Sequence, residues 1–175
     1  CECEMIEKII KSRYGVFGGV CTSNNGTVLV NSLKTHYRYL LSDKICKNYP
    51  ENQLVFHFED WPIVNGAFDM IILHHSLELT SNSHALLREA VRAVRSKGKL
   101  IIIGFNPFSL CHLGYYFFPK KMKLLKSNQL ISVKRLIDWL KLLDCCIDNI
   151  WYGGHHLPLI TNSRSTWWSL FQSRR

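Results

Sequence analysis

Residues 68–107, "FDMIILHHSLELTSNSHALLREAVRAVRSKGKLIIIGFNP", constrain the fold more than any other part of the chain. Met70–Leu73 and Leu100–Phe105 are almost purely apolar, as is typical of strands buried on both faces of a parallel sheet. Between them, a helix is expected to begin at Ser83 as its N-cap and to end at Gly98. Its apolar stripe consists of Leu86, Leu87, Ala90, Val91 and Val94. This segment therefore predicts a strand, a crossover helix and a second parallel strand.

The rest of the chain continues the alternation of strands and helices. The other strands are expected at Tyr14–Val20, Tyr37–Leu41, Leu54–Phe58 and Cys146–Trp151. Val28–Val30 suits a strand, but a helix over Val28–Thr35 is preferred because it lies between two parallel strands. Ser132–Leu143 is a further helix, with Ile137, Leu140 and Leu143 facing the core. The pattern predicts a doubly wound, mostly parallel α/β sheet with helices on both faces, a three-layer α/β/α arrangement.

These elements divide the chain into three parts. Residues 1–13 form an amphipathic N-terminal helix, residues 14–151 one α/β domain, and residues 152–175 a tail without clear periodicity. An apolar content of 47% excludes a disordered chain. Seven cysteines, an odd number with no C-x-x-C pair, and a start without a secretory leader favour reduced thiols in the cytoplasm. No metal site is expected, because no two cysteine pairs have zinc-site spacing.

The net charge of +9 suits a surface that attracts phosphate, nucleic acid or acidic lipid, but it does not identify a partner. The segment 115–126, "YYFFPKKMKLLK", combines aromatics with lysines, a pattern suited to peripheral membrane contact or a lid over a hydrophobic substrate. An insertion packing its aromatics on the sheet edge is the alternative. Leu100–Phe118 is not expected to span a membrane, because Asn106, Pro107 and His112 interrupt it.

Ligands of doubly wound sheets bind beyond the carboxyl ends of the strands. The residues expected at these ends are Gly18, Gly19, Ser42, Asp43, Glu59, Asp60, Trp61, His74, His75, Ser76, Leu77 and Asn106. Most are small, polar or ionisable, so the sequence predicts a ligand site along this edge.

At these strand ends the sequence resembles the class I S-adenosylmethionine-dependent methyltransferases. The resemblance rests on "HFEDWPIVNGAFDMIILHHSLEL" and "HALLREAVRAVRSKGKLIIIGFNP". "GFNPFSL" and "LISVKRLIDWLKLLD" resemble a bacterial branch, similar to methyltransferase type 11, whose substrates are not established. The similarity extends over Tyr14–Trp151 and is strongest at Leu54–Pro107.

The resemblance implies a role for each matching position. Asp60, with Glu59 and Trp61 beside it, would contact the adenine of S-adenosylmethionine, and Asp43 would bind the ribose hydroxyls. Gly18 and Gly19 would allow close approach of the cofactor to the backbone. His74, His75, Ser76 and Leu77 would line its methionine end and the acceptor entrance.

The sequence also departs from the family. The glycine loop holds only "FGGVCTSNNG", the helix between the second and third strands must be missing or reduced to one turn, and the C-terminal strand looks truncated. These departures keep a second hypothesis open, a degenerate methyltransferase fold that serves as a binding or scaffold protein. The aromatic and basic ending "SRSTWWSLFQSRR" keeps a third, a basic nucleic-acid-binding module.

The leading hypothesis is a methyltransferase that acts on a small or hydrophobic acceptor. In methyl transfer the protein mainly aligns the nucleophile, the methyl group and the sulfur. It also supplies a base where the nucleophile carries a proton. His74 and His75 are the candidates for that base, because imidazole titrates near neutral pH. The alternative is that one of them hydrogen-bonds the backbone at the strand end and the other packs under the helix. Asp69 is expected to stabilise the loop before its strand, and Glu78 to cap a turn or anchor the loop.

Overall fold

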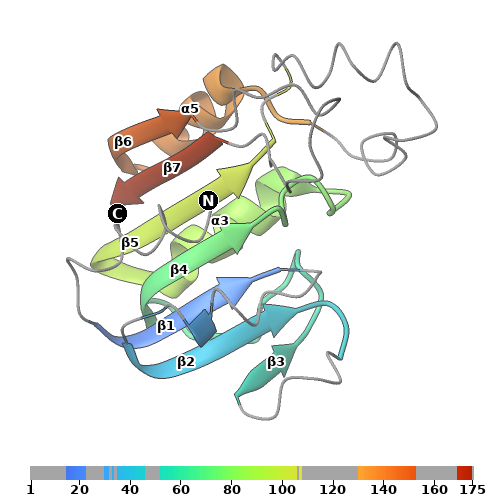
Figure 1. The fold of residues 1–175 in the computed structure, drawn as a ribbon, viewed down its shortest axis with the longest axis vertical. Helices are drawn as coiled ribbons and strands as arrows, with labels where there is room; N and C mark the ends of the chain where they lie inside the picture. Colours follow the sequence, from blue (N-terminus) through green and yellow to red (C-terminus); the bar gives the residue numbers. More distant parts are fainter. Residues whose placement is uncertain are drawn as a thin grey trace, which may run out of the picture.

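A computed structural model of the chain describes residues 15–22, 30, 31, 33, 35–45, 52–105, 107, 130–152 and 169–174. It contains one seven-stranded sheet in the order β3-β2-β1-β4-β5-β7-β6 (Figure 1). The strands are β1 (Gly15–Cys21), β2 (Thr35–Ser42), β3 (Gln53–Val55), β4 (Phe68–His74), β5 (Val94–Gly104), β6 (Cys146–Tyr152) and β7 (Ser169–Arg174). The pairs within β1 to β5 are parallel, whereas β7 is antiparallel to β5 and β6. The predicted mostly parallel α/β sheet is confirmed.

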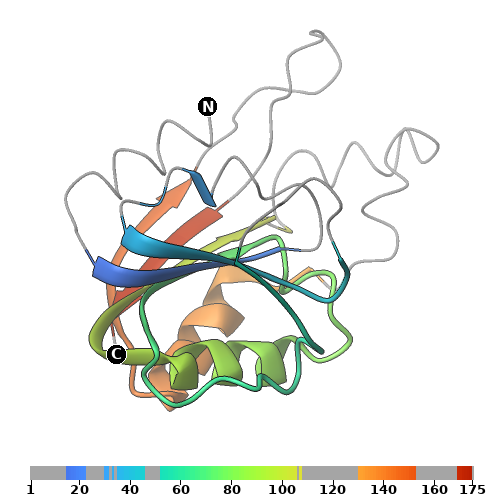
Figure 2. The same cartoon turned by 90° about the horizontal axis from the view of Figure 1, so that it is seen from below.

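Two helices, α3 (Ser83–Ala93) and α5 (Val133–Leu142), cover the same face of the sheet (Figure 2). Ser132 caps α5, since its hydroxyl accepts from the amide of Arg135. The helix predicted over residues 1–13 lies outside the described residues, and of Val28–Thr35 only Val30 and Asn31 are described as helical. None of the helices in the described ranges is long and apolar enough to cross a membrane.

The helix α3 begins at Ser83 as predicted, but the predicted N-cap and the predicted end were wrong. The N-cap is Asn82, whose side chain accepts from the amide of Ala85, while the Ser83 hydroxyl donates to the carbonyl of Leu77. The helix ends at Ala93, and Gly98 lies inside β5, where the pairing with β4 shifts register. A Cβ on Gly98 would lie 2.5 Å from Val94 Cγ1 and 2.8 Å from the carbonyl oxygen of Arg95. The glycine is therefore needed for an irregular strand entry, not for a helix end.

The strand β7 lies in the segment 152–175, for which the sequence indicated no regular structure. It inserts between β5 and β6, pairing Ile102 with Phe171 on one side and Ile150 with Phe171 on the other. The C-terminal strand, which looked truncated in the sequence, is thus present and six residues long.

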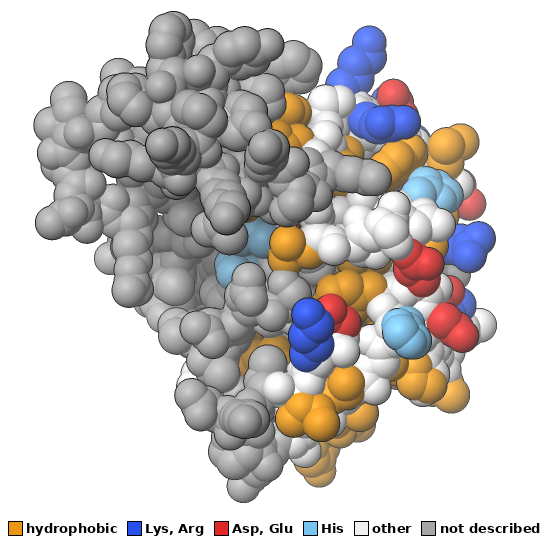
Figure 3. All heavy atoms as spheres, turned by 90° about the vertical axis from the view of Figure 1, so that its right-hand side faces the viewer, with side chains coloured by type: hydrophobic (Ala, Val, Ile, Leu, Met, Phe, Trp, Pro, Cys, Tyr) orange, Lys and Arg blue, Asp and Glu red, His pale blue; other side chains and the backbone are white. Residues whose placement is uncertain are grey.

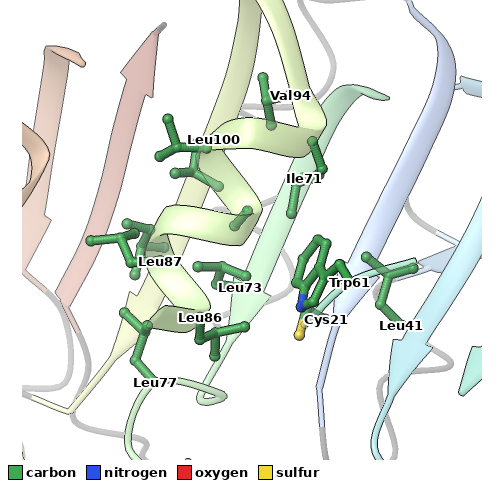
Figure 4. Close-up of a cluster of buried hydrophobic side chains, with 14 of the residues drawn as sticks. Cys21, Leu41, Trp61, Ile71, Leu73, Leu77, Leu86, Leu87, Val94 and Leu100 are labelled. Atoms are coloured by element: carbon green, nitrogen blue, oxygen red, sulfur yellow. The ribbon is translucent and has the colours of Figure 1, made fainter. Parts of the chain in front are cut away.

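The core lies between α3, α5 and the sheet. Leu86 and Leu87 of α3 are fully buried, as are Ile71 and Leu73 of β4 (Figure 4). Burying such a side chain contributes about 1.5–3 kcal/mol. The predicted apolar stripe of α3 therefore faces the sheet and packs against β4 and β5.

Candidate functional site

The parallel strands end at one edge of the sheet. Cys21 at the end of β1 pairs with Leu41 and Leu73, so Thr22, Ser42 and His74 follow at the same level. Figure 3 looks onto this side of the molecule, where histidine, acidic and hydrophobic side chains share the described surface. The register therefore brings together the strand ends expected to hold a ligand.

Asp43 is the first residue after β2, and its side chain is exposed. The turn it stands on is tied to β3, because Gln53 Nε2 donates to Ser42 Oγ at 2.9 Å and to the Lys44 carbonyl at 3.0 Å. The Ser42 hydroxyl itself donates to Lys44 at 2.7 Å. A carboxylate on a fixed turn at a strand end is placed to accept hydrogen bonds from a ligand.

Cys21, next to this turn, is fully buried. Burial raises the pKa of its thiol from 9.0 to about 12; a hydrogen bond with Ser76 opposes the rise, and the charge of Asp43 adds to it. The influence of Asp43 and Ser76 on one thiol shows that the ends of β1, β2 and β4 converge. At neutral pH the thiol is protonated, and we assign it no role as a nucleophile.

The raised pKa predicts a loss of stability at alkaline pH. The unfolded thiol ionises near pH 9 and the folded one near 12, so the contribution of this group is complete below 9 and falls between these values by about 1.4 kcal/mol per pH unit. We expect the difference in unfolding free energy between the wild type and Cys21→Ala to shift accordingly between pH 8 and pH 10 in urea titrations. The same shift in Cys146→Ala, where the thiol is exposed, would contradict this assignment.

The acidic segment after β3 presents two carboxylates and one buried indole. Glu59 and Asp60 are exposed, and Glu59 accepts from the Ser81 hydroxyl at 2.6 Å. The Trp61 side chain lies in the core, with its indole N–H donating to the Phe58 carbonyl at 3.0 Å (Figure 4). The adenine contact expected for Glu59, Asp60 and Trp61 stays a prediction, and the ring of Trp61 is part of the core.

Two residues of α3 hold this segment in place. Glu89 accepts from the amide of Trp61 at 3.3 Å and from Arg92, which donates to the carbonyls of Trp61 and Ile63 at 2.9 and 2.7 Å. Arg92 also donates to Asn65 Oδ1 at 2.7 Å. The bond from Arg92 holds the pKa of Glu89 below its usual value, so this acid is ionised at neutral pH. We call Glu89 and Arg92 the loop clamp.

The two predicted histidines are both present at the end of β4, in different surroundings. His74 Nδ1 lies 3.3 Å from the hydroxyl of Thr22. His75 has a positive φ of 49°, and its ring stacks on Phe105 with centroids 4.2 Å apart. Its Nδ1 lies 3.8 Å from Glu78 Oε1. The second imidazole thus faces a carboxylate.

Glu78 anchors the loop after β4, as the sequence suggested. Its side chain is 4% exposed, and Oε1 accepts from the amide of Phe105 at 2.6 Å. The bond joins the loop after β4 to the end of β5, two strand ends that would line an acceptor site.

Gly18 and Gly19 lie inside β1 and not in the loop beyond it. A Cβ on Gly18 would lie 2.7 Å from Thr35 Oγ1, and one on Gly19 would lie 3.1 Å from Leu41 Cδ1. Their small size serves packing between β1 and β2, and the cofactor contact expected for both stays a prediction. Residues 23–29, which include the turn-rich part of the predicted loop, lie outside the described residues.

Ser76 and Leu77 are also buried, at 0% and 4% exposure. Leu77 belongs to the core, and the Ser76 side chain lowers the pKa of the Cys21 thiol against the effect of burial. We therefore assign them the support of the site rather than ligand contact. Sequence reasoning missed Thr22 and the loop clamp, because their partners lie 52 and about 30 positions away. Asn106 lies outside the described residues.

Comparison with known proteins finds one family of domains that part of the chain resembles. Residues 20–102 match the family model described as "Methyltransferase domain". YafS of Escherichia coli and MJ1123 of Methanocaldococcus jannaschii, both uncharacterised, are 32% and 30% identical over 83 residues, 47% of this chain. The match spans only 35% and 40% of these two relatives.

Solved structures of low sequence identity share the fold. An S-adenosylmethionine-dependent methyltransferase of Thermotoga maritima has a TM-score of 0.73 at 14% identity, covering 98% of this chain and 88% of its own. Geranyl diphosphate C-methyltransferase of Streptomyces coelicolor has 0.69 at 12%, covering 99% and 78%. The [4+2]-cyclase SpnF has 0.71 at 9%, covering 99% and 79%. The chain therefore shares its fold with these structures, and residues 20–102 are similar to a methyltransferase domain.

Proposed function

We propose that this methyltransferase domain binds S-adenosylmethionine and transfers its methyl group to a small or hydrophobic acceptor. The observation that carries the proposal is that Asp43, Thr22 and His74 lie at one edge of the sheet, and that Glu59, after β3, is bonded to Ser81 in the segment after β4. Sequence similarity over residues 20–102 supports it independently.

The available side chains fit the cofactor. Asp43 presents an exposed carboxylate that can accept from both ribose hydroxyls, and Asp60 one that can accept from the adenine amine. His74 and His75 lie toward the methionine end and the acceptor. When bound, the cofactor supplies a methyl group on positively charged sulfur, which is already a good leaving group. The residues of the chain then have to align the acceptor and take up its proton.

The acceptor class is supported by similar proteins and not by the described residues. The Streptomyces coelicolor structure was solved with geranyl diphosphate and S-adenosyl-L-homocysteine, a hydrophobic acceptor and the spent cofactor. The segment 115–126, predicted to admit a hydrophobic substrate or to contact a membrane, lies outside the described residues. We also propose a cytoplasmic location, because the three cysteines in the described ranges carry free thiols.

Titration calorimetry with S-adenosylhomocysteine tests cofactor binding. We expect Asp43→Asn to weaken binding by about tenfold or more, because a hydrogen bond to a charged group contributes about 1.5–3 kcal/mol. Asp144→Asn is the matched control, since Asp144 is exposed, follows α5 and has a φ of 56° that asparagine tolerates.

Absence of binding to the wild type at millimolar ligand would contradict the proposal. Equal affinity of Asp43→Asn and Asp144→Asn would contradict the assigned ribose site. Because a cyclase shares the fold, binding alone does not establish transfer. Binding without transfer of labelled methyl to any component of a cell extract would favour the binding or scaffold protein.

A further inference from the structure

His75 and Glu78 form a partly hidden pair in the turn after β4. Their side chains are 14% and 4% exposed, and Nδ1 of His75 is itself buried, 3.8 Å from Glu78 Oε1. The pair lies at the edge of the sheet that carries the candidate site, since His74 is the last residue of β4. Burying a carboxylate in such a position costs free energy unless neighbouring groups pair with its charge or donate hydrogen bonds to it.

The position of the Glu78 carboxylate is fixed from two sides. Oε1 accepts from the amide of Phe105 at 2.6 Å, and a Cβ on Gly104 would come within 2.7 Å of the same oxygen. Any larger residue at position 104 would press on this oxygen. The end of β5 is therefore shaped to hold this carboxylate against His75.

The ring of His75 is held just as firmly. Its amide donates to the Ile103 carbonyl at 2.9 Å, its ring stacks on Phe105, and the ring of His74 lies edge-on at 4.7 Å. A carboxylate facing Nδ1 favours a proton on that nitrogen, so in the neutral ring Nε2 carries the lone pair. Nδ1 of His74 lies instead 3.3 Å from the neutral hydroxyl of Thr22.

We propose that Glu78 is a positioning residue that makes Nε2 of His75 the proton acceptor for the methyl acceptor, an inference that rests on the proposed function. The nucleophilic atom of the acceptor gives an electron pair to the methyl carbon while the carbon–sulfur bond breaks and its pair stays on sulfur. The proton of that nucleophilic atom moves to Nε2, and the Glu78 carboxylate stabilises the resulting imidazolium. Solvent then takes the proton.

The dyad narrows the class of acceptor. A base is needed only where the nucleophilic atom gives up a proton as the new bond forms, so we assign the acceptor to the hydroxyl compounds, alcohols and phenols. A thioether or a carbon of an isolated double bond needs no such proton acceptor in the step that forms the new bond.

The tautomer of His75, read from ¹⁵N chemical shifts of its imidazole in the full chain, tests the dyad without an acceptor. We expect the neutral wild-type ring to be mainly the Nδ1–H form and that form to lose its majority in Glu78→Gln, which keeps an oxygen for the Phe105 amide. Gly104→Ala, which displaces the carboxylate without removing it, should act in the same direction. Glu59→Gln is the matched control and should leave the His75 signals unchanged.

A wild-type ring that is mainly Nε2–H, or one that keeps its tautomer in both Glu78→Gln and Gly104→Ala, overturns the dyad. Binding of S-adenosylhomocysteine is measured on the same samples, and we expect Glu78→Gln to bind it as the wild type does. If the wild type does not bind S-adenosylhomocysteine, the proposed function is contradicted instead. Labelled products that carry the new methyl on carbon or on a thioether sulfur overturn the acceptor class.

Discussion

Arg92→Ala is expected to lower the free energy of unfolding by about 3 kcal/mol, among the largest effects of any single substitution near the site. The guanidinium joins α3 to the carbonyls of Trp61 and Ile63 and to Glu89. Its loss leaves two carbonyls and a mostly buried carboxylate short of donors. Because the Arg92 side chain is 30% exposed, water replaces some of these bonds, and the effect stays below that of a fully buried pair.

The measurement is urea unfolding of Arg92→Ala beside Arg88→Ala. Arg88 is the matched control, as it lies on the same helix, is exposed and reaches Glu89 only through its charge. Surface substitutions of this kind change stability by about 0.5 kcal/mol or less. Equal stability of the two variants would show that the loop clamp does not support the fold.

The clamp also has a signature in pH. Arg92 holds the pKa of Glu89 below its usual value of 4.5, so the stability from this pair is present above pH 4.5 and is lost as the pH falls through the lower folded value. The difference in free energy of unfolding between the wild type and Arg92→Ala should therefore become smaller at acidic pH. Since the clamp carries the segment with Glu59 and Asp60, the variant should also bind S-adenosylhomocysteine more weakly.

Local patterns predicted the central elements well. The buried runs of β4 and β5 and the stripe of α3 are properties of contiguous residues, and each was found within a few positions of its expected bounds. The cap of α3 was misplaced by one residue, since serine and asparagine suit the same position and the choice depends on which side chain reaches Ala85.

The roles of single site residues were harder to predict. Gly18 and Trp61 are residue types that ligand sites use, yet Gly18 is small because Thr35 of β2 leaves no room for a Cβ, and Trp61 turns inward to the core. The deciding neighbour is in each case distant in sequence. Asp43 and His74 kept their predicted places because a strand end positions its next residue regardless of distant contacts.

The strand β7 illustrates the same limit at the level of topology. Its residues Ser169–Arg174 are few and lie in a tail that shows no periodicity, and their strand form depends on the open edges of β5 and β6. Pairing of that kind is set by backbone groups of other strands, which local sequence does not record.

Asp69→Ala is the second substitution with a large expected effect, a loss of about 3 kcal/mol. Oδ2 of Asp69 accepts from the amides of Val16 and Phe17 at 2.6 and 2.9 Å, and Oδ1 pairs with Arg95 Nε at 2.5 Å. The sequence assigned this carboxylate to the loop before its own strand, but it stabilises the start of β1, more than fifty residues away. Alanine leaves two amides without their acceptor, each costing about 1–3 kcal/mol, reduced where water enters.

Hydrogen exchange separates this role from a general loss of stability. The amides of Val16 and Phe17 should lose protection in Asp69→Ala, and in Asp69→Asn to a smaller degree, because the amide oxygen still accepts. Asp138→Ala, at an exposed position of α5, is the control for removing a carboxylate. β1 runs from these two amides to Cys21, and Thr22 follows it. Loss of the bonds from Asp69 would therefore destabilise the strand on which the candidate site is built. Unchanged protection in Asp69→Ala would mean that β1 is held by its pairing with β2 and β4 alone.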